Sequence, residues 1–556
     1  MLFALCGNFQ GCANQTTENK NTTEPTEIAE EASWPMSGNA SLQQNILEDN
    51  YRTYYEIFLY SFYDSDGDGI GDIQGLIEKL DYINDGDATT TTDLGFNGIW
   101  LMPIMPAASY HKYDVTNYEA IDPQYGTMED FEQLIAECKK RGIRVIIDLV
   151  LNHTSSSHPW FTEACDYLNQ LKDQESNIQG FLPTDYYHFS REKQSGYYPV
   201  PGNDNWYYEA GFWSEMPDLN LENQRVRTEI SEITQFWIDK GVDGFRLDAV
   251  KEFESGSDSA NIEILSWFMN MVQAQKEDIY VVGEMWSDLS AYAPYYGSGI
   301  TSLFDFAFAD SGGIIANVVK GITPASGYGK ALVKVQESFE SYSSSYMDAP
   351  FYTNHDMGRS AGYYAGDTSE DQTKLAGALN LLMSGSAFVY YGEELGMKGS
   401  GKDENKRAPM YWSKDDSTTG MCDGPSDMDV VNMKYDSLEE QQQAEDSIYN
   451  YYKNAILLRN AYPEMARGKV AFIEELSNDA VCVLTKEYQE EKLTIIINAS
   501  DTQQMVDCNR LQELTGSCQE IAGALYTGKE QTKYQEDLLT IPPYGIILLN
   551  STDTGN

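Results

Sequence analysis

Four short segments of the chain combine carboxylates with histidine, arginine or asparagine in patterns that could perform acid–base chemistry. They read DLVLNH over 148–153, GFRLD over 244–248, VGEM over 282–285 and TNHD over 353–356. Each segment follows or ends an apolar run typical of a buried strand. Buried carboxylates cost free energy, so a cluster of them needs a chemical reason.

Glycoside hydrolysis supplies such a reason, because it uses one carboxylate as nucleophile or base and a second carboxyl group as acid. Arg246 and Asp248 lie two residues apart on a predicted strand, so their side chains point to the same face. A cation beside Asp248 favours its ionised form, which suits a nucleophile. Glu284 has no such partner nearby in the sequence and is therefore the better candidate for the protonated acid.

Eight near-continuous apolar runs predict strands that are buried on both faces of a parallel sheet. Helical patterns at 131–142, 226–241, 261–276 and 374–383 precede four of these runs, and two of the patterns end in Lys or Arg followed by Gly, a helix stop. Eight strand–helix units predict an α/β fold, the (β/α)8 TIM barrel, whose active face is the carboxyl end of its strands. The predicted strands are 53–62, 96–103, 144–152, 242–250, 279–286, 302–308, 349–356 and 386–394.

Two further regions do not fit the barrel pattern. Residues 154–214 are too long for a plain loop and predict a small subdomain inserted after the third strand. A long helix around 443–466 is followed by four short apolar runs that predict a C-terminal antiparallel β-sandwich. The predicted domains are a leader and acidic tether (1–45), the barrel (46–153 and 215–465), the inserted subdomain (154–214) and the sandwich (466–556), with the four short runs at 470–476, 480–488, 492–500 and 544–550.

The four chemical segments resemble, in order and spacing, the signature segments of the α-amylase family, glycoside hydrolase family 13. MPDLN at 216–220 resembles a fifth segment and looks intermediate between the oligo-1,6-glucosidase and neopullulanase variants. The segments at 112–131 and 407–412 add to the resemblance, which runs from about residue 50 to the C-terminus.

The resemblance implies a retaining double displacement and a role for each matching position. It implies that Asp248 is the nucleophile, Glu284 the acid/base and Asp356 the carboxylate that binds the distorted sugar. It also implies substrate contacts from Arg246, His153, His355 and Tyr113.

Two positions depart from the family pattern. Lys112 stands where the family often has Gly, and its long side chain could reach into the cleft. Lys251 is followed by Glu252 where a His is usual, so the contacts on the leaving-group side are the least defined.

An acidic loop that follows the first predicted strand, over residues 64–72, predicts a metal site. Oxygen-bearing side chains alternate with glycines along it, a spacing that wraps a hard cation such as Ca²⁺. The twelfth position is Gly75 instead of Glu, which argues against an EF-hand sensor, and an acidic turn without metal is the alternative. Resemblance to calcium-binding relatives implies a structural Ca²⁺ site made by Asp64, Asp66, Asp68, Asp72 and the carbonyl of Ile70.

Composition and the N-terminus bear on partners and location. The net charge of −50 disfavours nucleic acid as a partner and is compatible with a neutral sugar. A short apolar start, a segment before Cys12 that resembles a lipoprotein box and an acidic tether suggest an extracellular, lipid-anchored bacterial surface protein; an ordinary flexible N-terminus is the alternative. The eight cysteines show no CxxC spacing, so a zinc site is not expected, while Cys508 and Cys518 could pair.

These observations predict an endo-acting α-amylase for starch and maltooligosaccharides. The nearest rivals share its chemistry: neopullulanase, cyclomaltodextrinase or α-glucosidase. A non-catalytic glucan-binding surface protein would not need the three carboxylates, and a calcium-regulated adhesin would leave them unexplained. The oligomeric state is not predicted.

Overall fold

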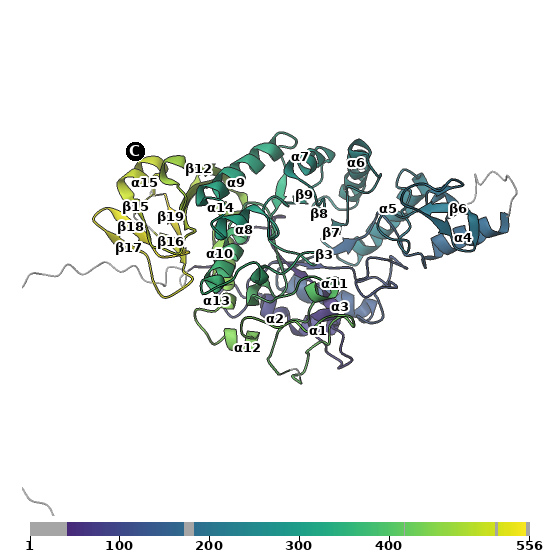
Figure 1. The fold of residues 1–556 in the computed structure, drawn as a ribbon, viewed down its shortest axis with the longest axis horizontal. Coiled ribbons are helices and arrows are strands. Elements are labelled where there is room, and N and C mark those ends of the chain that lie inside the picture. Colours follow the sequence, from purple (N-terminus) through teal and green to yellow (C-terminus); the bar gives the residue numbers. More distant parts are fainter. Residues whose placement is uncertain (1–41, 172–182, 416, 518–520, 552–556) are drawn as a thin grey trace, which may run out of the picture.

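The computed structural model describes residues 42–171, 183–415, 417–517 and 521–551. Cys12 and the rest of the leader and tether up to residue 41 lie outside the described residues, as does Cys518, so the lipid anchor and the pairing of Cys508 stay predictions. The barrel occupies the middle of the molecule, with the inserted subdomain at one end and the C-terminal domain at the other (Figure 1). In the described part of the chain, no helix has the length and apolar character needed to cross a membrane.

Eight parallel strands form the barrel in the order β10-β9-β8-β7-β3-β2-β1-β11, which confirms the predicted TIM fold. A parallel bridge between Phe351 and Phe388 joins the two ends of this order. The seventh strand was predicted at 349–356, and this was wrong for most of its length, because the strand ends at Ala349 and the apolar run continues as a buried loop. The strands are β1 (Thr53–Ile57), β2 (Gly98–Leu101), β3 (Arg144–Leu149), β7 (Gly244–Leu247), β8 (Tyr280–Gly283), β9 (Ser302–Phe304), β10 (Met347–Ala349) and β11 (Ala387–Tyr390).

All four helices predicted in front of strands are present. The first two end where Gly142 and Gly241 adopt the left-handed conformation, which favours glycine. The long helix predicted around 443–466 was wrong as a single element, since Pro463 has no N–H to continue it and Tyr462 is extended. The principal helices are α3 (Met128–Lys140), α5 (Gln224–Asp239), α6 (Asp258–Gln275), α9 (Ala325–Glu340), α10 (Ser369–Leu381), α13 (Ile448–Ala461) and α14 (Pro463–Arg467); shorter ones are α1 (Ile73–Glu78), α2 (Leu80–Ile83), α7 (Leu289–Tyr292), α8 (Ile314–Val319), α11 (Asp403–Lys406) and α12 (Leu438–Gln441).

The segment between β3 and α5 contains helix α4 (Pro159–Leu171) and a three-stranded antiparallel sheet. The sheet has the order β4-β6-β5, with β4 at Phe189–Ser190, β5 at Tyr197–Val200 and β6 at Asn203–Glu209. The chain then returns to the barrel, where the Leu219 N–H donates to the Asn152 carbonyl at 2.8 Å. The MPDLN segment therefore lies against the end of the third barrel strand, next to His153.

Two antiparallel sheets form the C-terminal domain, as expected for a sandwich. The larger has the order β12-β13-β14-β19-β16 and the smaller β15-β18-β17. Alternate residues of the larger sheet face opposite ways: Val481 and Val483 pack between the two sheets, while Cys482 and Leu484 pack into the barrel core. The elements are β12 (Lys469–Phe472), β13 (Val481–Tyr488), β14 (Glu491–Asn498), β15 (Gln504–Asp507), α15 (Cys508–Thr515), β16 (Ile521–Leu525), β17 (Lys533–Gln535), β18 (Leu538–Ile541) and β19 (Ile546–Asn550).

Candidate active site

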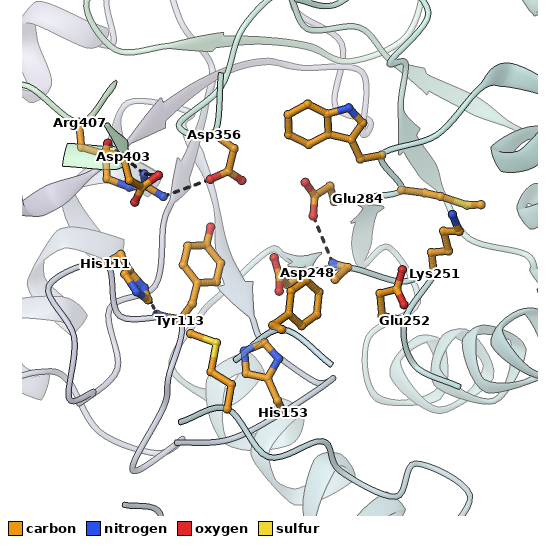
Figure 2. A pocket seen from close by; sticks show the side chains of 15 residues that line it. His111, Tyr113, His153, Asp248, Lys251, Glu252, Glu284, Asp356, Asp403 and Arg407 are labelled. Carbon is orange, nitrogen blue, oxygen red and sulfur yellow. Dashed lines mark hydrogen bonds and ion pairs between the residues drawn. The ribbon is translucent and has the colours of Figure 1, made fainter. Parts of the chain in front are cut away.

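A cavity of about 390 Å³ opens at the carboxyl ends of the barrel strands and brings the three predicted carboxylates together. Asp248 comes directly after β7, Glu284 directly after β8, and Asp356 lies in the loop that follows β10. Their side chains point into the same space (Figure 2). The parallel sheet explains this convergence, since all of its strands end at the same edge.

Arg246 is the cation around which this site is built. Its Nη1 lies 2.7 Å from Asp248 Oδ1 and 2.9 Å from Asp148 Oδ1, and its Nη2 lies 3.1 Å from Glu284 Oε2. The guanidinium is fully buried and lies 5.3 Å from the Trp100 ring centroid. One positive charge is therefore shared by carboxylates from three neighbouring strands.

Glu284 has the character of an acid at neutral pH. Burial raises the pKa of its carboxyl to about 7; Asp248 and Asp356 add to the rise and Arg246 opposes it. The Ala249 N–H donates to Glu284 Oε2 at 3.3 Å and orients the group. A carboxyl group with this pKa is protonated in a large part of the molecules near pH 7.

Asp356 lies in the opposite electrostatic environment. Burial pushes its pKa up, but the charge and hydrogen bond of His355, together with Arg407, outweigh burial and hold the pKa of Asp356 well below its usual range. His355 Nε2 is 3.1 Å from Asp356 Oδ2, and Arg407 Nη2 is 3.2 Å from Oδ1. Asp356 is therefore a stable anion that still exposes part of its side chain to the cavity.

Tyr113 lines one side of the cavity, and the fully buried His355 lies directly behind it. Their rings stack at 5.5 Å, and the Tyr113 hydroxyl lies 2.8 Å from His355 Nε2 while it donates to Asp148 Oδ2 at 3.0 Å. Burial lowers the pKa of His355, yet Asp356 and Glu56 outweigh it and raise that pKa to about 9. His355 and Tyr113 together present a cation and an aromatic ring to the anionic Asp356.

His153 also lines the cavity, from the loop that follows β3. Burial lowers the pKa of its imidazole, so the ring is neutral at pH 7, and it packs 5.5 Å from the ring of Phe212. The structure thus brings together all seven residues predicted for catalysis and substrate contact. Five of them line the cavity, whereas Arg246 and His355 are fully buried behind it and touch the lining residues; the five are Asp248, Glu284, Asp356, His153 and Tyr113.

The expectation that Lys112 reaches into the cleft was wrong. Its ammonium group is buried 2.8 Å from Asp122, above the ring of Tyr125, and the residue does not line the cavity. Lys251 and Glu252, the pair in which the family usually has His at the second position, both line the cavity and therefore face the substrate.

Several residues of the site were not predicted. Arg407 ion-pairs with Asp403 at 2.6 Å as well as with Asp356, which closes one side of the cavity. Trp286 stacks on Phe306 at 5.4 Å and is 53% exposed beside Glu284. Two features of the sequence could have indicated them: Arg407 begins the segment at 407–412 that resembles the family, and Trp286 follows Glu284 by two residues.

The acidic loop between β1 and α1 partly matches the predicted calcium ligands. Carboxylate oxygens of Asp64, Asp66 and Asp72 lie within 4.8 Å of one another, a set of hard donors suited to Ca²⁺. The Asp68 carboxylate does not belong to this group and accepts the Ile70 N–H at 2.8 Å. A Cβ at Gly75 would stand 2.0 Å from the Tyr63 carbonyl oxygen, so the loop cannot take the EF-hand glutamate.

Comparison with known proteins is consistent with this geometry. The model of the α-amylase catalytic domain matches residues 56–468. Alpha-amylase 3 of Dictyoglomus thermophilum is 36% identical over 502 residues, which cover 89% of this chain and 92% of that protein. The oligo-1,6-glucosidase of Heyndrickxia coagulans is 28% identical over 540 residues, covering 80% and 91%. The solved structure of Eubacterium rectale Amy13B superposes with a TM-score of 0.89 at 49% identity, covering 93% and 98%.

The chain therefore belongs to the α-amylase family, and it is a glycoside hydrolase built on a TIM barrel. The family resemblance noted in the sequence is confirmed.

Proposed function

We propose that this enzyme is a retaining, endo-acting α-amylase that cleaves α-1,4-glucosidic bonds in starch and maltooligosaccharides. The observation that carries the proposal is the shared contact of Arg246 with Asp248 and Glu284, which directly follow two adjacent strands. The similarity to proteins named α-amylase supports the choice of substrate. Retention is the standard outcome in this family and requires carboxyl groups roughly 5–5.5 Å apart.

In the first step, Asp248 attacks the anomeric carbon while Glu284 gives its proton to the glycosidic oxygen. The bond to the leaving sugar breaks and an ester forms between Asp248 and the donor sugar. Arg246 holds the attacking carboxylate in place and favours its negative charge. Glu284 supplies the proton because its pKa is raised to about 7.

In the second step, Glu284 takes a proton from water and the resulting nucleophile attacks the same carbon. The ester bond breaks, Asp248 is released as a carboxylate, and the product keeps the α configuration. The ester carries no charge, so it no longer raises the pKa of Glu284 as the free Asp248 does. The pKa of Glu284 is therefore lower in the ester intermediate, where the carboxyl group must be ionised to take a proton from water.

Positive charge develops on the sugar ring in both transition states. Asp356 is held as an anion by His355 and Arg407, so it can stabilise that charge without taking a proton. Tyr113 supplies an aromatic face at the same subsite, and His153 a neutral imidazole that can bond sugar hydroxyls.

Calcium and the cell surface complete the proposal. Asp64, Asp66 and Asp72 would hold a structural Ca²⁺ that ties the loop after β1 to the start of α1 and takes no part in the chemistry. The acidic N-terminal segment and Cys12 support an extracellular enzyme anchored by lipid to a bacterial surface.

The decisive experiment is a time course of products from soluble starch, pullulan and cyclodextrin, separated by chromatography. Early mixed maltooligosaccharides from starch with little cleavage of cyclodextrin are expected. Release of glucose alone from chain ends would exclude endo action. An absence of any product would restore the non-catalytic glucan-binding alternative.

A second activity, on α-1,6 bonds, is the principal competitor. It is favoured by the MPDLN segment at 216–220 and by similarity to a protein named oligo-1,6-glucosidase. With isomaltose added to the substrates of that experiment, release of glucose from isomaltose, or of maltotriose from pullulan, in preference to cleavage of starch would support it over the α-amylase proposal.

A further inference from the structure

Glu56 is a buried carboxylate inside the barrel whose role is not explained by the mechanism above. It lies on β1, and its Oε1 is 2.6 Å from Nδ1 of His355. Both side chains are about 1% exposed, so water does not compete for this contact. Glu56 does not line the substrate cavity; its side-chain contact with the site is the imidazole, and its charge also faces Arg246 and Asp356 at longer range.

The other side of that imidazole faces the catalytic carboxylate Asp356. His355 Nε2 is 3.1 Å from Asp356 Oδ2 and 2.8 Å from the hydroxyl of Tyr113, which itself donates to Asp148. An ionised carboxylate can only accept hydrogen bonds, so when Glu56 and Asp356 are both ionised each of the two ring nitrogens must carry a proton for both contacts to be attractive. The geometry is therefore that of an imidazolium held between two carboxylates.

We propose that Glu56 is a positioning residue that keeps His355 doubly protonated, so that its Nε2 always donates toward Asp356. The inference rests on the proposed function only in that Asp356 is taken as a catalytic carboxylate. Loss of the second proton would turn Nε2 into an acceptor that faces an anion, and Asp356 would lose the bond that keeps it ionised and in place.

The charges around His355 support this assignment. Negative groups face it from β1 (Glu56) and from its own loop (Asp356), and Asp148 and Glu284 contribute from β3 and β8. The nearby cations, Arg246 and Arg407, are each paired with carboxylates of their own. The raised pKa of His355, about 9, keeps the cation intact throughout the range in which Glu284 titrates.

Glu56→Gln separates charge from shape. The amide oxygen can still accept the Nδ1 proton, so the ring keeps its orientation, but the buried negative charge is gone. The pKa of His355 should then fall below its raised wild-type value, because burial disfavours the cation and Asp356 alone is left to oppose it. The defect should therefore grow as pH rises, whereas a purely structural defect would be equal at every pH.

The experiment combines ¹⁵N NMR of the imidazoles with kcat/KM on maltotetraose between pH 5 and 8.5. The chain has five histidines, and the His355 signal is identified by its loss in His355→Asn. In the wild type both His355 nitrogens should be protonated at pH 7.5. In Glu56→Gln one should be unprotonated, and kcat/KM should fall roughly 10- to 100-fold at pH 7.5 with partial recovery at pH 5.

Two variants complete the design. Glu56→Asp keeps the charge and should restore the protonated state in part. Glu394→Gln is the matched control, since Glu394 is equally buried and accepts from Tyr55 and Tyr82 without touching His355. Its pH profile should keep the wild-type shape.

A neutral His355 in the wild type at pH 7.5, or a loss in Glu56→Gln that is the same at all pH values, would overturn the proposal. The NMR result does not depend on turnover, so it stands apart from any failure of the proposed function.

Discussion

At the scale of single residues, the site is defined by a shortage of positive charge. Arg246 contacts Asp148, Asp248 and Glu284, and one cation cannot neutralise three carboxylates. The energetic cost is relieved when a carboxyl group keeps its proton, and burial raises the pKa of both Glu284 and Asp148, to about 7 and about 6. Of these two, only Glu284 lines the cavity, so only the proton of Glu284 can reach a substrate.

The nucleophile assignment makes the first prediction. Asp248→Asn keeps the shape of the side chain but removes the attacking oxyanion, so kcat on maltotetraose should fall below about 1% of wild type. The melting temperature should change little, because the amide can still accept from Arg246. Asp288→Asn, an exposed residue outside the cavity, serves as the control and should retain full activity. Activity well above that level in clean protein would contradict the assignment.

The acid role of Glu284 makes the second prediction. Its pKa in the folded protein is raised to about 7, so the protonated form is present below pH 7 and is lost as pH rises through that value. The profile of kcat/KM should therefore have an alkaline limb centred near pH 7. A substrate with a dinitrophenyl leaving group needs no proton and should lack this limb. An identical limb for both substrates would assign it to another group.

Residues that follow a strand in the sequence were accessible to sequence analysis, whereas residues brought in by distant segments were not. Asp248 and Glu284 stand directly after apolar runs, so their place at the barrel mouth could be predicted. Glu56 lies within such a run, and only its 2.6 Å contact with a residue 299 positions away shows its importance. Lys112 was misjudged because sequence does not reveal its ion pair with Asp122.

At the scale of elements, all eight barrel strands could be predicted, because burial on both faces makes them continuous apolar runs. Their ends could not, since buried loops such as the one after β10 continue the same composition. The three strands of the small sheet of the sandwich were not predicted, because they do not form continuous apolar runs. These strands are three or four residues long and partly exposed, as at β17, so they give no clear periodicity.

The acidic loop carries a prediction at this scale. Three carboxylates within 4.8 Å repel one another, and a cation bound between them would remove that repulsion, so removing Ca²⁺ with a chelator should lower the melting temperature by about 2 °C or more. Asp66→Asn should lower the melting temperature and abolish the effect of the chelator. Asp87→Asn, in an exposed turn elsewhere, should leave that effect unchanged. An unaltered melting point after demonstrated removal of metal would refute a stabilising role.

At the scale of the whole molecule, the barrel and the C-terminal domain share one core. Cys482, Leu484 and Ile495 of the sandwich belong to the same buried cluster as the barrel side chains. Polar ties accompany this packing: the buried Lys486 donates to the Met465 carbonyl and to Ser384, and Lys374 donates to the carbonyls of Asp446 and Thr527. Separate unfolding of the two domains would expose this shared surface, so we expect them to unfold together.

Gly329 tests that shared core. It lies in α9 where this helix packs against β12 and β13, and an added Cβ would stand 2.4 Å from Phe472 Cδ2 and 3.0 Å from Cys482 Sγ. Alanine is favoured over glycine in a helix by about 1 kcal/mol, but overpacking costs about 1–3 kcal/mol. Gly329→Ala should therefore lower the melting temperature by roughly 1–4 °C. Calorimetry should show a single transition that shifts as a whole.

Gly327→Ala is the control: Gly327 is half-exposed on the same helix, and an added Cβ there meets only the side chain of Thr323, so this change should cost less. Two separate transitions, or a rise in melting temperature for Gly329→Ala, would mean that the barrel and the sandwich are joined only loosely at this helix.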